Sequence, residues 1–496
     1  MQKTKLMKLL NIFLSILILL ILIVYYSNLK TIMDYDIELQ RITILAIIIF
    51  LYCLVTSMLC KSKITNLSII YIVFYMIFIF GSFIAHFCFN FSEENTEALY
   101  KMMDPYYLLQ AGILSIYCLL GIHIGAAIAS YTTKQAELKE KEEVIDKEIV
   151  IKTIRRVSAI LLVISTLSAI ITFYNNAILA YQGGYSAVYS TTSYGINSLH
   201  EKLEPFFYVG LLLLMVSYKE QRKKANVVFL INLLYNGVQI FFGARGLPIL
   251  RVLMLLLTYH FCNKTFSKKA IVVGLVLLIP VVGTVSMLKS VRKYPIEEWL
   301  SKAAVIWQET MEDQPILTTI NEMGMAIFPT AASIQLYPET FSYKYGTTYL
   351  YGLTTIIPNI SSGQTHMAKQ ANVSDEVGNY FGISFGGSVV EDIYANFGWF
   401  CPLAAIFIGF FLYRISDKVM KRYKQNYILF PLYAALSVEI IWTVRNTINP
   451  IIRYFVWYIL TTYILYKLLY QYYKKKEKDV FDGNREDFDY HTNLPS

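Results

Sequence analysis

The sequence predicts an all-helical protein that crosses a membrane many times. Of its 496 residues, 56% are hydrophobic and only 16% are charged, whereas a soluble globular protein carries roughly 25% charged residues. The charges are bunched into short clusters between long apolar runs. A helix needs roughly 17 to 25 residues to cross a bilayer, which is the length of most of these runs. Membrane topology therefore explains the net charge of +9, and nucleic-acid binding is not expected.

We predict about twelve membrane spans, with a long polar segment between the ninth and the tenth. The apolar runs that predict them lie near residues 9–26, 42–60, 67–89, 106–130, 157–180, 205–218, 226–243, 247–262, 270–288, 395–413, 427–444 and 450–473.

Lysine and arginine are concentrated in alternate connections between these spans, as expected for loops that stay in the cytoplasm. Most of the 44 basic residues fall on the inner side when the N-terminus is placed inside. We therefore expect a multi-pass protein of the cytoplasmic (inner) membrane, with both termini in the cytoplasm. The inner basic segments are Lys3–Lys8, Lys61–Lys63, Lys134–Arg156, Lys219–Lys224, Lys264–Lys269, Arg414–Lys424 and Lys467–Arg485.

This topology divides the chain into four regions. Spans one to nine occupy residues 1–288, a large extracytoplasmic loop occupies 289–394, spans ten to twelve occupy 395–473, and a cytoplasmic tail occupies 474–496.

Two segments of the large loop have a sequence pattern that indicates their structure or role. Residues 296–312 place Trp299, Ala303, Ile306 and Trp307 on one helical face, which suits a helix that packs on the bundle or lies on the membrane surface. Residues 337–387 are rich in Gly, Ser, Thr and Tyr, which is typical of a binding surface.

Five arginines lie at the predicted outer face, against the usual positive-inside bias. Each one alone can be explained by a side chain that reaches to the interface. Together they suit phosphate, because the guanidinium group makes paired, charge-assisted hydrogen bonds. They predict a site for a lipid-linked pyrophosphate in the headgroup layer. The five are Arg245, Arg251, Arg292, Arg445 and Arg453.

Two acidic residues, Glu391 and Asp392, follow a Gly-Gly-Ser turn at the start of the tenth span. A carboxylate in apolar surroundings can act as a general base. The alternative is an ordinary helix N-terminus, where acidic residues interact favourably with the helix dipole. His366, in the loop, is a competing candidate base.

The sequence contains no motif for a soluble cofactor or nucleotide site. We find no P-loop, no dinucleotide-binding glycine pattern, no zinc-binding helix motif and no CxxC pair among the six cysteines. A reaction at the outer face must therefore draw its energy from the substrate, for example a lipid-linked phosphoanhydride.

Three stretches resemble the Wzy-type polysaccharide polymerases that make O-antigen or capsule. The first is an Arg-Gly turn that opens a helix, and the second is a Tyr-rich segment that ends on Ile-Pro within the large loop. The third is a Gly-Ser turn followed by Glu and by Asn-Phe-Gly. Their sequences are FFGARGLPILRVLMLLL (241–257), TTYLYGLTTIIPNI (347–360) and GGSVVEDIYANFGWFCPLAAIFIG (386–409).

The resemblance implies a glycosyltransferase bundle of the C type that works without a nucleotide, a cofactor or a metal. Such proteins transfer a growing glycan from undecaprenyl pyrophosphate to a fresh lipid-linked repeat unit. Undecaprenyl-pyrophosphate-linked glycans and membrane lipid are the expected partners, with a flippase and a chain-length regulator as candidates. Glu391 is then the expected base, with Asp392 or His366 as alternates. The expected pyrophosphate-binding residues are Arg245, Arg251, Arg292 and Arg445.

Other functions remain open. A flippase for lipid-linked sugar should line helix interiors with polar residues and needs no large outer loop. Another lipid-dependent glycosyltransferase or a glycan ligase is suggested by Asp34 and Asp36, a DxD-like pair in the first outer loop. A scaffold protein is the third alternative. Accumulation of single lipid-linked repeats after deletion would indicate a polymerase, and accumulation on the cytoplasmic leaflet would indicate a flippase.

Overall fold

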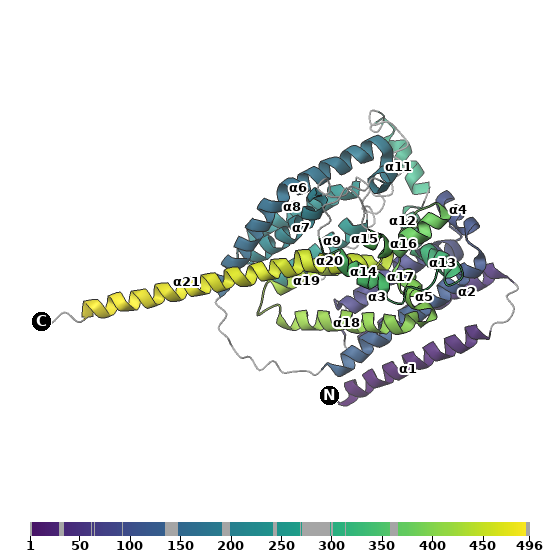
Figure 1. Ribbon diagram of the computed structural model, residues 1–496, viewed down its shortest axis with the longest axis horizontal. Coiled ribbons are helices and arrows are strands. Elements are labelled where there is room, and N and C mark those ends of the chain that lie inside the picture. The colour runs from purple at the N-terminus through teal and green to yellow at the C-terminus, as the bar shows by residue number, and fades with distance from the viewer. Residues whose placement is uncertain are drawn as a thin grey trace. The chain divides into compact units, whose positions relative to one another are not determined.

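The regular secondary structure in the described part of the chain is entirely helical, with no β-strand (Figure 1). The prediction of an all-helical protein is thus confirmed. The computed structural model describes residues 2–28, 34–60, 62–63, 65–91, 93–133, 147–190, 199–241, 246–267, 269, 298, 301–312, 314–357 and 366–492.

Seven helices among the described residues are long and apolar enough to cross a membrane. Each overlaps a span predicted from the sequence, so a multi-pass architecture is confirmed. They are Thr4–Ser27, Tyr35–Leu59, Leu67–Cys88, Pro105–Thr132, Lys147–Leu179, Gly246–Asn263 and Val389–Arg422.

The full count of about twelve spans stays a prediction. The predicted span at 270–288 lies outside the described residues. The other four fall on helices that are shorter or more polar: 205–218 on α7 (Leu199–Ser217), 226–243 on α8 (Arg222–Phe241), 427–444 on α19 (Leu429–Trp442), and 450–473 on α20 (Asn449–Tyr454), η8 (Phe455–Leu460) and α21 (Thr461–Thr492).

The chain folds into two compact units. Unit 1 comprises residues 1–136, 266–420 and 437–453, and unit 2 comprises 137–265, 421–436 and 454–496. Each unit therefore contains segments far apart in the sequence.

Unit 1 is built on α5, which is buried over almost its whole length. The helix begins at Pro105, where the Asp104 side chain accepts a hydrogen bond from the Tyr106 backbone N–H at 2.8 Å. The helices of this unit are α1 (Gln2–Ser27), α2 (Tyr35–Leu59), α3 (Leu67–Phe83), η1 (Ile84–Cys88), α4 (Glu94–Met102), α5 (Pro105–Thr132), α11 (Ala303–Glu312), α12 (Pro315–Met323), η5 (Gly324–Ala326), α13 (Ile327–Leu336), α14 (Thr347–Thr354), α15 (His366–Gln370), α16 (Val373–Phe381), α17 (Val389–Phe397), η6 (Gly398–Phe400), most of α18 (Cys401–Arg422), the end of α19, η7 (Thr443–Arg445) and most of α20.

Glycines allow α5 and α18 to pack backbone against backbone. A Cβ atom at Gly125 would lie 1.9 Å from the Ile406 carbonyl oxygen, and one at Gly409 would lie 1.9 Å from that of Ile122. Small residues at such contacts are typical of helix pairs in membranes, where close van der Waals packing replaces the hydrophobic effect. This contact fixes α18, and with it the preceding α17, against the centre of unit 1.

The described part of the predicted loop at 289–394 packs into unit 1 as short helices. α13 is almost completely buried, and a Cβ at Gly324 of η5 would lie 1.9 Å from the Ser82 backbone nitrogen of α3. The helix expected at 296–312 is present in part as α11, in which Ile306 is buried and Trp307 is exposed. Trp299 lies outside the described residues.

The segment at 337–387 is more closely packed than a simple binding surface, because α14 and α16 each bury one face. Thr348 and Gly352 of α14 are buried, as are Val373 and Val377 of α16. These helices bring loop residues next to α17, which begins at Val389, six residues before the predicted start of the tenth span.

Unit 2 is a bundle of long helices in which α6 packs along α7. Ser158 Oγ of α6 donates to the Gly210 carbonyl of α7 at 2.8 Å. The helix α21 continues through most of the predicted tail. The unit contains α6 (Lys147–Ser190), α7, α8, α9 (Gly246–Thr258), η3 (Tyr259–Asn263), the start of α19, η8 and α21.

Candidate active site

The candidate site lies at the N-terminus of α17, where a Gly-Gly-Ser turn leads into the helix. Gly386 has a φ of 76°, which favours glycine. Ser388 Oγ accepts a hydrogen bond from the Glu391 N–H at 2.9 Å, and Glu391 Oε2 accepts one from the Ser388 N–H at 3.0 Å. This reciprocal pair is a capping box. Glu391 therefore stabilises the start of the helix, as the alternative interpretation of the sequence predicted.

Capping uses only one of the two carboxylate oxygens of Glu391. Oε2 also accepts a hydrogen bond from Ser374 Oγ of α16 at 2.8 Å. Oε1 is buried and has no hydrogen-bond partner among the described residues. A buried polar atom without a partner costs about 1–3 kcal/mol, so such atoms in a folded protein call for an explanation. The open oxygen can accept a hydrogen bond or a proton from a ligand.

Asp392 repeats this arrangement on the next residue. Its side chain is 0% exposed, and Oδ2 accepts a hydrogen bond from the Ile448 N–H at 3.0 Å. Oδ1 is buried and unpartnered within the described part of the chain. Two neighbouring carboxylates thus each keep one oxygen unsatisfied, which distinguishes them from acids that only cap a helix.

Arg445 lies on the segment that supplies this contact to Asp392. It ends η7, three residues before Ile448, and its side chain is partly exposed. The segment passes close to the Gly-Gly-Ser turn, because a Cβ at Gly387 would lie 3.3 Å from both Asn446 Cα and Thr447 N. The fold therefore brings the backbone around Arg445 to the two acids that the sequence analysis singled out.

The charges of the acids influence two tyrosines from the predicted loop. Burial raises the pKa of Tyr337, and its hydrogen bond to Glu376 and the charges of Glu376, Glu391 and Asp392 raise it further. Burial also raises the pKa of Tyr349, with Asp392 as the next cause. Both tyrosines therefore remain protonated and lie within electrostatic reach of the acids.

Arg251 has a partner of its own within unit 2. Its guanidinium donates to Glu204 Oε1 at 2.8 Å and to Oε2 at 3.2 Å, and Tyr235 donates to Oε1 at 2.6 Å. The ring of Tyr208 lies 5.3 Å from the guanidinium carbon. Arg251 and Glu204 are both buried, so each charge is balanced inside the bundle.

The structure describes only some of the other candidates. Arg245 and Arg292 lie outside the described residues, as does the side chain of His366, the first residue of α15. Arg453 is exposed on α20. Asp34 caps α2 by accepting hydrogen bonds from the backbone N–H groups of Asp36 and Ile37. Within the described ranges, no group of three or more His, Cys, Asp or Glu side chains is placed to hold a metal ion.

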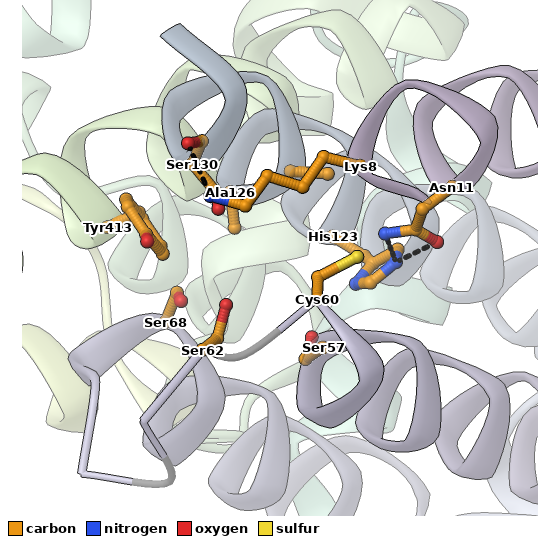
Figure 2. Close-up of a pocket in the computed structure, with 11 residues that line it drawn as sticks. Lys8, Asn11, Ser57, Cys60, Ser62, Ser68, His123, Ala126, Ser130 and Tyr413 are labelled. Carbon is orange, nitrogen blue, oxygen red and sulfur yellow. Dashed lines mark hydrogen bonds between the residues drawn. The ribbon is translucent and has the colours of Figure 1, made fainter. Parts of the chain in front are cut away.

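Away from the acids, a polar pocket lies in unit 1 among α1, α2 and α5 (Figure 2). Lys8 Nζ donates to the Ser130 carbonyl at 2.9 Å. His123 lies 3.2 Å from both Asn11 Nδ2 and Thr56 Oγ1. These contacts cross-link three membrane helices, which gives the buried histidine a structural role.

Most hydrogen-bond partners of the two acids are not apparent from the sequence. The Ser-x-x-Glu spacing of Ser388 and Glu391 is a visible capping signal. Ser374 and Ile448 come from other elements and have no local signal, and neither does Glu204, the partner of Arg251.

Together, the fold and this site define a multi-pass helical membrane protein with a buried pair of partly unsatisfied acids. The family model for the O-antigen polysaccharide polymerase Wzy matches residues 9–477, nearly the whole chain, and the chain belongs to this family. The family polymerises O-antigen repeat units and acts on lipid-linked oligosaccharides in the membrane, so the resemblance noted in the sequence is confirmed. No curated protein and no solved structure matches the chain.

Proposed function

We propose that the protein transfers a growing glycan from undecaprenyl pyrophosphate to the sugar end of a second lipid-linked repeat unit. The reaction takes place at the outer face of the cytoplasmic membrane, and both termini of the protein lie in the cytoplasm. Membership of the polymerase family supports repeat-unit polymerisation. The observation that carries the assignment of the site is the pair of open oxygens, Glu391 Oε1 and Asp392 Oδ1.

The chemistry requires one proton acceptor. A hydroxyl oxygen of the acceptor attacks the anomeric carbon of the donor glycan and forms the glycosidic bond. The bond between that carbon and the pyrophosphate oxygen breaks, and its electron pair leaves with the lipid pyrophosphate. Glu391 takes the hydroxyl proton on Oε1, with Asp392 or His366 as the alternate base.

The departing pyrophosphate needs positive charge. Arg445 is our first candidate, because its segment contacts Asp392 through the Ile448 N–H. Arg245 and Arg292 remain candidates from the sequence. Arg251 could bind the phosphate only if the phosphate displaced Glu204 from it. We therefore assign Arg251 a mainly structural role in unit 2. A guanidinium that stabilises the leaving group contributes a few kcal/mol, or about 100-fold in rate.

The proposed reaction fixes the place of the protein in a sequence of steps. Its substrates must first reach the outer leaflet, which requires a flippase, and the length of its product requires a regulator of chain length. Both are proposed partners, and the product is O-antigen or capsule.

Deletion followed by gel analysis of lipid-linked glycans tests the proposal. We expect single repeats to accumulate on the outer leaflet and polymer to disappear. Repeats trapped on the cytoplasmic leaflet would instead indicate a flippase, and unchanged polymer would exclude the proposed function.

A further inference from the structure

A short turn in unit 1, which we call the tyrosine turn (Tyr343–Thr348), is fastened to the C-terminal end of α17. The backbone N–H of Lys344 donates to the Ala395 carbonyl at 2.9 Å, and that of Tyr345 donates to the Asn396 carbonyl at 3.0 Å. The Gly346 N–H donates to Asn396 Oδ1 at 2.9 Å. The turn is therefore held through its own backbone N–H groups, and these hydrogen bonds do not depend on its exposed side chains.

Tyr345 adopts an unfavourable backbone conformation in this turn. Its φ is 49°, in the left-handed region that bulky L-residues rarely adopt. The side chain is 78% exposed, so burial does not offset the cost. A glycine would make the same turn without strain. A strained backbone that presents an exposed ring suggests a function for that ring.

A series of ring contacts leads from Tyr345 through Tyr343 and Tyr394 to Trp399. Tyr343 makes an edge-to-face contact with Tyr345, the ring centres being 6.4 Å apart, and a similar contact with Tyr394 at 5.9 Å. Trp399 contacts Tyr394 at 6.1 Å and is 45% exposed. Gly398 is required here, because a Cβ would lie 2.9 Å from the Tyr343 ring. The exposed faces of Tyr345 and Trp399 are thus supported by packed aromatic rings.

Polar groups lie at the edge of this aromatic cluster. Lys344 Nζ donates to Glu376 Oε1 at 2.9 Å, and the Tyr337 hydroxyl donates to Oε2 at 2.7 Å. Lys344 and Glu376 are both partly exposed. Flat aromatic faces beside charged hydrogen-bonding groups match a pyranose ring, whose C–H face stacks on aromatics while its hydroxyls make hydrogen bonds.

The same helix fixes the distance from the turn to the acids. Asn396, which holds the turn, lies one helical turn after Asp392, a rise of about 6 Å. Its side chain also donates to the Asp392 carbonyl at 2.8 Å. Asn396 therefore connects the tyrosine turn to the helix that carries Glu391 and Asp392.

We propose that the tyrosine turn, with Tyr345 and Trp399 as its exposed rings, is the subsite that binds a pyranose of the acceptor repeat unit. It holds the acceptor so that its hydroxyl reaches Glu391 or Asp392. This inference rests on the proposed function. The competing occupant is the membrane interface, where exposed tyrosines are common.

Substitutions of Tyr345 separate these explanations. Phe and Trp keep a flat aromatic face, and we expect them to keep most of the polymerisation rate. Leu, Ala and Gly remove that face, and we expect about a 5- to 10-fold higher KM for the acceptor repeat with a smaller change in kcat. Tyr174→Ala is a matched control, since Tyr174 is 63% exposed on α6 of unit 2.

The Gly and Leu variants can each overturn the inference. Gly relieves the backbone strain, so parent-like kinetics for Tyr345→Gly would mean that the ring has no role. Leu remains apolar, so parent-like kinetics for Tyr345→Leu would assign the ring to the membrane interface.

A binding measurement keeps this test separate from the proposed chemistry. The probe is the oligosaccharide released by mild acid from the lipid-linked repeats of cells that lack the protein. Saturation-transfer NMR would follow its binding to the full-length Glu391→Gln protein, with and without Tyr345→Ala. Weaker binding in the double variant supports the subsite. Polymerisation by Glu391→Gln would refute only Glu391 as the base and would leave this result unchanged. Equal binding in the two proteins overturns the subsite.

Discussion

The acid pair of α17 in unit 1 and the Glu204–Arg251 pair of unit 2 are both buried charges in helical bundles, but they differ in how they are satisfied. Glu204 has both oxygens bound by Arg251 and receives a further hydrogen bond from Tyr235. Glu391 and Asp392 each keep one oxygen without a partner in the described structure.

We propose that this difference separates a structural pair from a reactive one. A carboxylate paired with guanidinium at both oxygens has no free acceptor, and breaking the pair leaves an unbalanced buried charge. A buried carboxylate oxygen without a partner raises the free energy of the folded protein, but it can accept a proton or a hydrogen bond from a substrate. In this account, a buried carboxylate is a candidate reactive group when one of its oxygens has no hydrogen-bond partner.

The largest expected effect comes from removing the charge of the proposed base. Glu391→Gln should reduce polymerisation by about 100- to 10,000-fold, the usual contribution of a general base. Glutamine also fits the capping box, so the start of α17 should persist. Gels of lipid-linked glycans should show single repeats only, with normal amounts of protein in the membrane. Long polymer from this variant would contradict the assignment of Glu391 as the base.

Removal of a phosphate-binding arginine should have the next largest effect. Arg445→Ala should slow polymerisation by about 100-fold, because the leaving group loses one charge-assisted contact. On gels, Arg245→Ala should likewise show single repeats in place of long polymer. Arg445→Lys serves as the control and should retain part of the rate through its charge. Normal polymer in Arg445→Ala would exclude it from the pyrophosphate site.

The structural pair should show its effect on stability. Arg251→Met alone leaves Glu204 buried and unpaired, which should destabilise the protein by about 3–5 kcal/mol. The double variant Glu204→Gln/Arg251→Met should recover most of this loss, since no uncompensated charge remains. Thermal unfolding in detergent measures both. If the double variant were destabilised by the sum of the losses of the two single variants, the assigned pairing would be contradicted.

The smallest effect is expected at the hydrogen bond between Ser374 and Glu391. Ser374→Ala removes one donor to Oε2 and leaves the Ser388 N–H bond in place. A net contribution of about 1 kcal/mol corresponds to roughly a 5-fold change in the polymerisation rate. Steady-state assays in membranes would detect it. A loss as large as that of Glu391→Gln would instead mean that Ser374 contacts the substrate.

The sequence predicted those features that depend on local pattern. Apolar runs predicted the seven long helices, and Glu391 and Asp392 stood out because charges at the start of a span are costly. The contacts that decide their roles come from distant segments. Ile448 reaches Asp392 across 56 residues, and Glu204 reaches Arg251 across 47. Arg251 therefore looked like a free cation in the sequence, because only tertiary packing reveals its partner.

The most direct measurement compares the two centres in one assay. Parent, Glu391→Gln and Glu204→Gln/Arg251→Met proteins would be reconstituted in liposomes with purified lipid-linked repeats, and polymer formation would be followed over time. We expect no polymer from Glu391→Gln and substantial polymer from the folded double variant. Parent-like polymerisation by Glu391→Gln, or none by a double variant of normal thermal stability, would contradict the account.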